Sequence, residues 1–141
     1  WDVAFRGTTI IVNGGAKAHN DQPDRTGNAA VYIAIGSMSE INSVDTNRLF
    51  QDNVSGSAIL ENMMVDDLGI SGEGWASYNY QTHIISPIPG RILVFRTQDN
   101  KYAKMEVLSF YDNPNPNPSE GDYGGFYTFN YVYQSNGGTT F

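Results

Sequence analysis

The stretch RILVFRTQDNKYAKMEVLSFYD, residues 91–112, decides the fold of this chain. It consists of two runs rich in β-branched and aromatic residues, 91–97 and 101–112, joined by the turn-forming triplet 98–100. This pattern predicts a β-hairpin, because such side chains pack well on a pleated surface and a short polar triplet closes a tight turn. Alternation along the second arm predicts one face with Ala103, Met105, Val107 and Ser109 and an opposite face with Lys104, Glu106, Leu108 and Phe110.

Further strands are predicted on both sides of this hairpin. Four segments have the β-rich or alternating pattern of strands: 8–15, 29–36, 75–80 and 126–134. The first of them ends at Asn13-Gly14-Gly15, a turn that needs a positive φ angle. Alternation in the last segment predicts one face with Tyr127, Phe129, Tyr131 and Tyr133 and another with Phe126, Thr128, Asn130 and Val132.

The segments between these strands have compositions typical of loops. Residues 17–28 are polar, residues 113–125 contain repeated Asn-Pro pairs, and residues 37–58 show no clear period beyond a short helical turn expected near 45–50. Strands without intervening helices predict an all-β protein with an antiparallel sheet and long loops. A length of 141 residues is typical of one domain, so residues 1–141 are expected to share one core.

Composition argues against several classes of function. Fifteen acidic residues against eight basic ones give a net charge of −7, which should repel phosphate backbones, so nucleic acid is not an expected partner. The chain has no cysteine, which excludes disulfides, thiolate metal sites and cysteine nucleophiles. The sequence has no GxSxG, HExxH or P-loop motif, and nothing in it indicates catalysis, so the chain is not expected to be an enzyme.

Several short motifs follow one another along the chain in a characteristic order. They are Trp1-Asp2, Ala4-Phe5, Ile11-Val12-Asn13-Gly14-Gly15, Gly74-Trp75, the 91–112 hairpin and the final YTFNYVY of residues 127–133. This ordered set resembles the HmuY family, which comprises haem-binding outer-surface lipoproteins of Bacteroidota. The resemblance covers most of the chain, most densely from 74 to 133.

The resemblance implies a hand-shaped all-β fold that grips one haem, or a related tetrapyrrole, between loops. It further implies that the protein passes this haem to a TonB-dependent outer-membrane transporter. The expected location is the outer membrane at the cell surface, held there only by a lipid anchor outside this chain, or the exterior after processing. Family members carry a further N-terminal segment before the Trp-Asp pair, and the chain is expected to lack it.

The family pattern directs attention to residues 61–83, ENMMVDDLGISGEGWASYNYQTH. The best-known members ligate haem iron with two histidines, one of them five residues after the tryptophan of the Gly-Trp pair. Tyr80 stands at that spacing from Trp75 here. Other members use methionines, and Met63 and Met64 lie in the upstream segment where the first ligand is expected.

Each candidate ligand has a structural alternative. Met63 and Met64 offer thioether sulfur, which favours ferrous iron, but methionine is also a common core filler. Tyr80 is expected either to bind ferric iron as phenolate, to bond a haem propionate, or to lie at a sheet edge with its hydroxyl in water. His83 offers imidazole from a loop before Ile84, or is simply solvated. His19 is expected at the surface.

Aromatic and basic residues near these candidates have side chains that suit contact with a haem. Trp75, Tyr78 and Phe50 are candidates to wall a porphyrin by ring stacking, although a β-rich core would use the same residues. Arg91 and Arg96 are candidates to pair with haem carboxylates, and their odd spacing allows only one of them to serve.

Two other functions remain open from the sequence. The first is a non-haem-binding accessory lipoprotein of the same fold, docked on an outer-membrane transporter, which the tyrosine at position 80 and the acidic, Asn/Pro-rich loops favour. The second is a carbohydrate-binding β domain that uses Trp75 and Tyr78 as stacking platforms.

Overall fold

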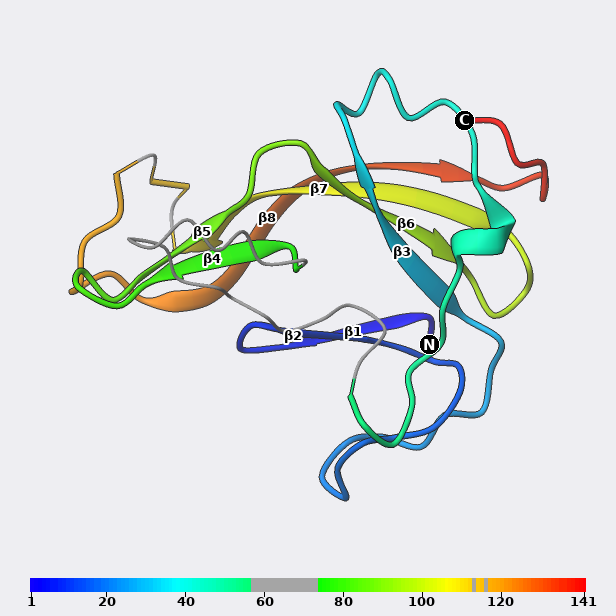
Figure 1. Ribbon diagram of the computed structural model, residues 1–141, viewed down its shortest axis with the longest axis horizontal. Coiled ribbons are helices and arrows are strands. Elements are labelled where there is room, and N and C mark those ends of the chain that lie inside the picture. The colour runs from blue at the N-terminus through cyan, green and yellow to red at the C-terminus, as the bar shows by residue number, and fades with distance from the viewer. Residues whose placement is uncertain (57–73, 113, 116) are drawn as a thin grey trace.

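The computed structural model describes residues 1–56, 74–112, 114–115 and 117–141. Strands and a single short 3-10 helix make up its regular structure (Figure 1). In chain order these elements are β1 (Val3–Arg6), β2 (Thr9–Val12), β3 (Ala30–Ile35), η1 (Thr46–Arg48), β4 (Ala76–Asn79), β5 (Ile84–Pro87), β6 (Arg91–Arg96), β7 (Tyr102–Tyr111) and β8 (Gly124–Gln134). The prediction of an all-β fold is confirmed. In the described ranges, no helix has the length and apolar character that a membrane-spanning segment requires.

The strands form one four-stranded sheet and two separate hairpins. The sheet has the order β3-β6-β7-β8, and the hairpins are β1-β2 and β4-β5. All of these strand pairs are antiparallel. In the sheet register, Leu93 of β6 lies opposite Ile33 of β3 and Met105 of β7, and Met105 in turn lies opposite Tyr131 of β8. The predicted hairpin of residues 91–112 is therefore confirmed as β6-β7.

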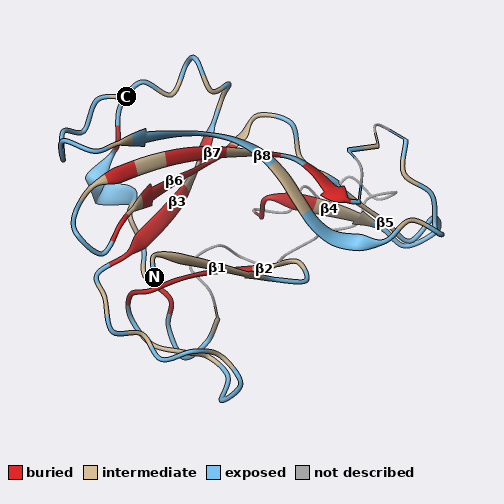
Figure 2. Ribbon diagram, turned by 180° about the vertical axis from the view of Figure 1, so that it is seen from behind, coloured by how far each residue is buried: buried red, intermediate tan, exposed pale blue. Residues whose placement is uncertain are grey.

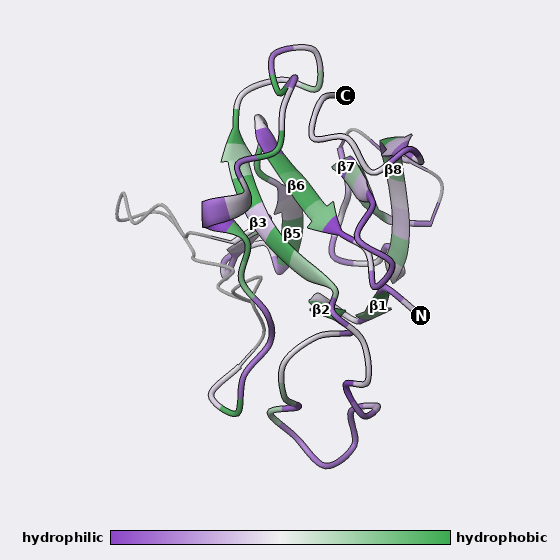
Figure 3. Ribbon diagram, turned by 90° about the vertical axis from the view of Figure 1, so that its right-hand side faces the viewer, coloured by the Kyte–Doolittle hydropathy of each residue, from purple (hydrophilic) through white to green (hydrophobic). Residues whose placement is uncertain are grey.

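The four-stranded sheet has a core on each face. Alternate residues such as Val31, Leu93 and Met105 belong to the larger core, together with Ile10 and Val12 of the β1-β2 hairpin and Trp75. The residues between them, such as Tyr32, Val94 and Tyr102, belong to a smaller core that the 38–49 segment and Phe141 cover. Figure 3 shows β3 and β6 as mainly hydrophobic ribbons, which agrees with burial on both faces.

Local sequence signals account for several of these elements. Asp45 begins the 3-10 helix with its side chain accepting a hydrogen bond of 3.1 Å from the Asn47 amide, as expected for an N-cap. The helical turn predicted near 45–50 is therefore confirmed. Asn100 adopts a φ of 59° in the β6-β7 turn, and Gly15 adopts the positive φ expected after β2.

Two strands were not predicted individually. β1 is only four residues long, and its residues alternate weakly between apolar and polar types. β5 contains Pro87 and is followed by Pro89, so proline argued against a strand there. Both strands exist because each pairs with a neighbour across a short turn, β1 with β2 and β5 with β4.

One predicted alternation is wrong at the end of β7. Phe110 was expected on the face of Lys104, but it lies in the larger core with Met105 and Val107. The reason is a pair of register shifts between β7 and β8, at Val107/Ser109 and Ser109/Tyr111. Such bulges rotate the strand, so that Phe110 and Tyr111 both reach the larger core. The predicted face of β8 is consistent with the structure, since Tyr127 and Phe129 both stack near Phe5.

Buried polar groups hold the long 13–28 loop against the strands. The Asn13 side chain donates to the Trp1 carbonyl at 2.7 Å and accepts from the amides of Thr26 and Gly27 at 2.8 and 3.1 Å. The Asp52 carboxylate accepts from the Val12 amide at 3.0 Å and pairs with Arg25 at the same distance. These bonds satisfy groups that burial would otherwise penalise.

Candidate functional site

The β4-β5 hairpin carries three of the residues that the sequence singled out: Tyr78, Tyr80 and His83. It projects at one end of the molecule (Figure 1). Asn79 closes its turn, because its side-chain oxygen accepts from the amides of Gln81 at 2.9 Å and Thr82 at 3.1 Å. His83 ends the turn with a φ of 57°, a left-handed conformation that is uncommon for residues other than glycine, although Asn, Asp and His adopt it more often than most.

Tyr78 and His83 are in direct contact across this hairpin. The Tyr78 hydroxyl lies 2.6 Å from Nδ1 of His83, and the two ring centroids are 6.1 Å apart. Tyr78 is half-buried and His83 is exposed. The hydrogen bond fixes the orientation of the imidazole and occupies Nδ1. In the tautomer in which Nδ1–H donates to the Tyr78 oxygen, Nε2 is the nitrogen left to bind a ligand.

Tyr80 lies in the same turn and is also accessible. Its side chain is 49% exposed, which leaves the phenol oxygen open to solvent or to a ligand. Tyr80 and His83 thus present one phenol and one imidazole from a single turn. Both groups are known axial ligands of haem iron.

Trp75 is not part of this exposed group. It is 2% exposed, its Nε1 donates to the Thr8 carbonyl at 2.9 Å, and its ring packs against Phe110 and Tyr127 at centroid distances of 6.0 and 5.2 Å. The indole faces are therefore covered by protein, and Trp75 is a core residue. This burial leaves no indole surface for a porphyrin wall or a sugar platform.

The remaining sequence candidates separate in space or lie outside the described residues. Met63 and Met64 belong to the range 57–73, which the structure does not describe. Phe50 is 64% exposed and bridges to Val31 at the edge of β3. Arg96 donates to the backbone carbonyl and side-chain oxygen of Asn28, both at 3.0 Å, which gives it a structural role.

The β4-β5 hairpin is tied to the main sheet close to its turn. The Ile85 amide donates to the Tyr111 hydroxyl at 2.8 Å, and the side chains of Ile84 and Ile85 pack against the larger core. Trp75, just before β4, adds its contact with Phe110. The turn residues 80–83 are therefore exposed, while Ile84 and Ile85 directly after them are held against β7 and the larger core.

Metal ligation by protein side chains alone has no support in the described part of the chain. No group of three or more His, Cys, Asp or Glu side chains gathers there. Haem has a different requirement, because the porphyrin supplies four nitrogens and the protein supplies only axial ligands. An exposed imidazole with a fixed ring is therefore a sufficient first ligand.

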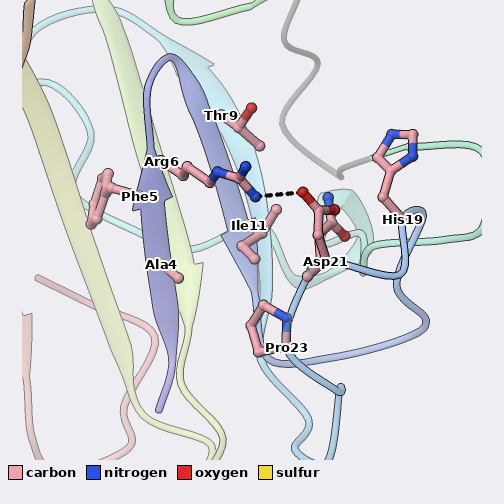
Figure 4. A pocket seen from close by; sticks show the side chains of 9 residues that line it. Ala4, Phe5, Arg6, Thr9, Ile11, His19, Asp21 and Pro23 are labelled. Atoms are coloured by element: carbon pink, nitrogen blue, oxygen red, sulfur yellow. Dashed lines mark hydrogen bonds and ion pairs between the residues drawn. The ribbon is translucent and has the colours of Figure 1, made fainter.

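A separate cavity of about 500 Å³ lies between the outward face of the β1-β2 hairpin and the loop around residues 19–23 (Figure 4). Arg6 from β1 spans it with an ion pair of 2.6 Å to Asp21. The hydrogen bond and the charge of Arg6 lower the pKa of Asp21 below its usual value of 3.8. His19 is exposed, as the sequence predicted, and is also one of the residues that line this cavity.

Sequence reasoning missed this cavity because its walls are joined by non-local contacts. The loop returns to the strands through Arg25, which pairs with Asp52 and also bonds Gln22 at 2.9 Å. No local pattern in residues 17–28 predicts that pairing. The Tyr78–His83 contact was missed for a simpler reason, namely that β5 was not predicted.

The chain matches no protein-family model and no curated protein. Its function is therefore argued from the geometry of its own residues and from the ordered motifs of its sequence.

Proposed function

We propose that this chain is a cell-surface haem-binding protein of the HmuY type, which captures haem or a related tetrapyrrole and passes it to a TonB-dependent outer-membrane transporter. The observation that carries this proposal is the contact of 2.6 Å between the Tyr78 hydroxyl and Nδ1 of the exposed His83. Histidines that bind metal through one ring nitrogen almost always have the other nitrogen bonded to a protein group. His83 has that arrangement in the tautomer in which Nδ1–H donates to the Tyr78 oxygen.

The chemistry of the hairpin tip supports an axial ligand role. When Nδ1–H of His83 donates to the Tyr78 oxygen, the lone pair of Nε2 is directed away from the protein and is available to iron. Tyr80 adds an accessible phenol from the same turn, which can bond a haem propionate or bind ferric iron. Met63 and Met64 remain candidates for the opposite axial position.

The exposure of the hairpin also suits transfer of haem. A guest held by Tyr80 and His83, both accessible on one turn, stays within reach of a transporter. Loops of this kind, with few buried contacts at the tip, open at low free-energy cost. Capture and release can then use the same hairpin.

A haemin titration tests the proposal. We expect wild type to give a shifted Soret band, and His83→Ala to lose that shift or to weaken haemin binding by at least tenfold. His19→Ala is the matched control, because the chain has only two histidines, and it should bind like wild type. Tyr78→Phe, which removes only the orienting hydroxyl, should weaken binding by about tenfold to a hundredfold.

Two results would count against this proposal at different levels. A wild-type protein that gives no Soret shift, with ferric or with ferrous haem, would overturn haem binding itself. A shift that survives unchanged in His83→Ala would remove His83 as the ligand and direct attention to Met63, Met64 and Tyr80.

A second candidate function is a non-haem-binding accessory lipoprotein docked on an outer-membrane transporter. The observation that favours it is the ordered acidic loop before β8. There the Asp122 carboxylate accepts from the Ser119 amide at 2.7 Å and from the Asn115 side chain at 3.3 Å, while Glu120 is exposed. A fixed acidic loop of this kind offers a surface for protein contact. Co-purification of the domain with a transporter, without absorbance in the haem band, would support this function over haem capture.

A further inference from the structure

The two edges of the four-stranded sheet differ in how they are covered. At the β3 edge, Val31 exchanges backbone hydrogen bonds of 2.9 and 3.0 Å with Phe50, and Arg48 donates to the Ile33 carbonyl at 2.6 Å. β8 is the strand at the other edge, and among the residues that the structure describes no segment pairs with its outer side. The β3 edge is thus partly covered by residues 48–50, whereas the outer side of β8 has no strand partner among the described residues.

The open edge strand lacks the features that normally prevent edge pairing. Proteins usually protect such edges with charged residues, proline or short length. Residues 124–134 contain no Asp, Glu, Lys, Arg or Pro, and β8 is 11 residues long. At about 3.4 Å per residue it extends about 37 Å, more than enough for a stable strand pair.

The side chains along this strand are large and exposed. Figure 2 shows much of β8 in the colour of exposed residues, in contrast to the buried ribbons of β3 and β6. The exposed fractions are 66% for Tyr131, 53% for Phe126, 47% for Tyr133 and 39% for Phe129, and Tyr123 just before the strand is 79% exposed. Exposed apolar surface of this extent marks an interaction site.

An apolar groove continues this surface onto the sheet. A cavity of about 170 Å³ lies beside β8, and Val3, Phe5, Met105, Phe129 and Tyr131 are among its lining residues. Phe5 and Phe129 stack at a centroid distance of 6.3 Å along one side of it. A strand added next to β8 would place its own aromatic side chains over this groove.

We propose that the occupant of the β8 edge is β8 of a second copy of this chain. The two strands pair antiparallel about a two-fold axis and join the sheets of the two copies into one, in the order β3-β6-β7-β8-β8-β7-β6-β3. An axis perpendicular to the sheet makes the interface isologous, so each copy supplies the same uncharged strand. This inference is independent of the proposed haem function, which concerns the β4-β5 hairpin.

Charge and area both favour a second copy. The chain has a net charge of −7, so two copies repel each other over most of their surface, but residues 124–134 contribute no charged side chain to a symmetric contact. Five exposed rings of about 200 Å² each, at these exposed fractions, amount to about 600 Å² of exposed ring surface per copy, so ring burial contributes at most about 1,200 Å² for the pair. This upper bound is at the lower end of specific interfaces, so the association should be weak and dependent on concentration.

Analytical ultracentrifugation of the full chain over a range of concentrations tests the dimer. We expect a monomer–dimer equilibrium for wild type and at least a tenfold weaker association for Tyr131→Lys, which places a charge on the open edge. The matched control is Val54→Lys, because Val54 is 75% exposed and lies away from β8. Circular dichroism and melting temperature establish that both variants are folded.

Cysteine crosslinking gives a second test that does not depend on a disruptive variant. The chain has no cysteine, so single cysteines at positions 128 to 132 report only on their own contacts. In an antiparallel symmetric pair, one position near the axis should form an intermolecular disulfide much faster than its neighbours and faster than Val54→Cys. A chain that stays monomeric at millimolar concentration, or that shows equal crosslinking at all positions, would overturn the proposal.

Discussion

Arg25 and Asp52 form an ion pair of 3.0 Å with both side chains only 1% exposed, although 27 residues separate them in the chain. The same carboxylate accepts from the Val12 amide at 3.0 Å. The pair therefore joins the 13–28 loop, the end of β2 and the segment after η1. Together with the hydrogen bonds of Asn13, it connects these parts of the fold.

Asp52→Asn should destabilise the protein strongly. The substitution leaves the Arg25 guanidinium buried without its counter-charge, which costs about 3–5 kcal/mol of unfolding free energy for pairs of this kind. Chemical denaturation measures the change. Asp24→Asn is the control, because Asp24 forms an exposed ion pair with Lys17 and its loss should leave the denaturation midpoint unchanged. Similar effects for the two variants would contradict the assigned role of Asp52.

Lys104→Met should loosen the smaller core. Lys104 is 5% exposed, and its Nζ donates to the carbonyls of Met38 and Ile41 at 2.7 and 2.8 Å. Methionine keeps the apolar chain but leaves two carbonyls without their donor, so we expect a loss of about 1–3 kcal/mol in unfolding free energy. The comparison is Lys17→Met, at a position where the side chain is 37% exposed. A stable Lys104→Met protein would mean that solvent satisfies both carbonyls.

Gly124→Ala should destabilise the start of β8. A Cβ at this position would lie 2.6 Å from Cε1 of Phe110, whose ring is packed in the larger core. Relief of that overlap requires movement of the ring, which typically costs about 1–3 kcal/mol. Gly121→Ala is the control, because a Cβ there has no atom within 4 Å. Differential scanning calorimetry of both variants should show a lower melting temperature only for Gly124→Ala.

Arg6→Ala should raise the pKa of Asp21 toward 3.8. The hydrogen bond and positive charge of Arg6 lower this pKa in the folded protein, so the interaction is complete above pH 3.8 and is lost as pH falls through the lowered folded value. NMR titration of the side-chain carboxyl carbons measures the shift. The pKa of Asp24, which Lys17 lowers, should not change in the same variant. An unshifted Asp21 would show that the ion pair across the cavity does not persist in solution.

Most of the strands could be predicted from the sequence because their signals are local. The β6-β7 hairpin follows from two β-rich runs around residues 98–100, and the 3-10 helix follows from Asp45 as its cap. The face of Phe110 could not be predicted, because the bulges that rotate β7 depend on its register with β8. β5 could not be predicted because it contains Pro87, and proline disfavours a strand. This strand is the one that brings His83 beside Tyr78.

The candidate site was predicted only in part, for similar reasons. The sequence indicated Tyr80 and His83 as candidate ligands, and the structure places them on one turn. It also indicated Trp75 as a wall residue, but the burial of that ring depends on Thr8, Phe110 and Tyr127, which come from distant parts of the chain. A tryptophan next to a strand has the same sequence signature in a core as in a cleft.

The hydrogen bond from the Ile85 amide to the Tyr111 hydroxyl links the β4-β5 hairpin directly to β7. Ile85 lies opposite Tyr78, directly beside the turn that carries Tyr80 and His83. Stiffening of the turn by a guest should therefore slow amide hydrogen exchange at Ile85 and, through this bond, in the bulged end of β7. Occupancy of the turn thus has a reporter in β7, a strand of the main sheet.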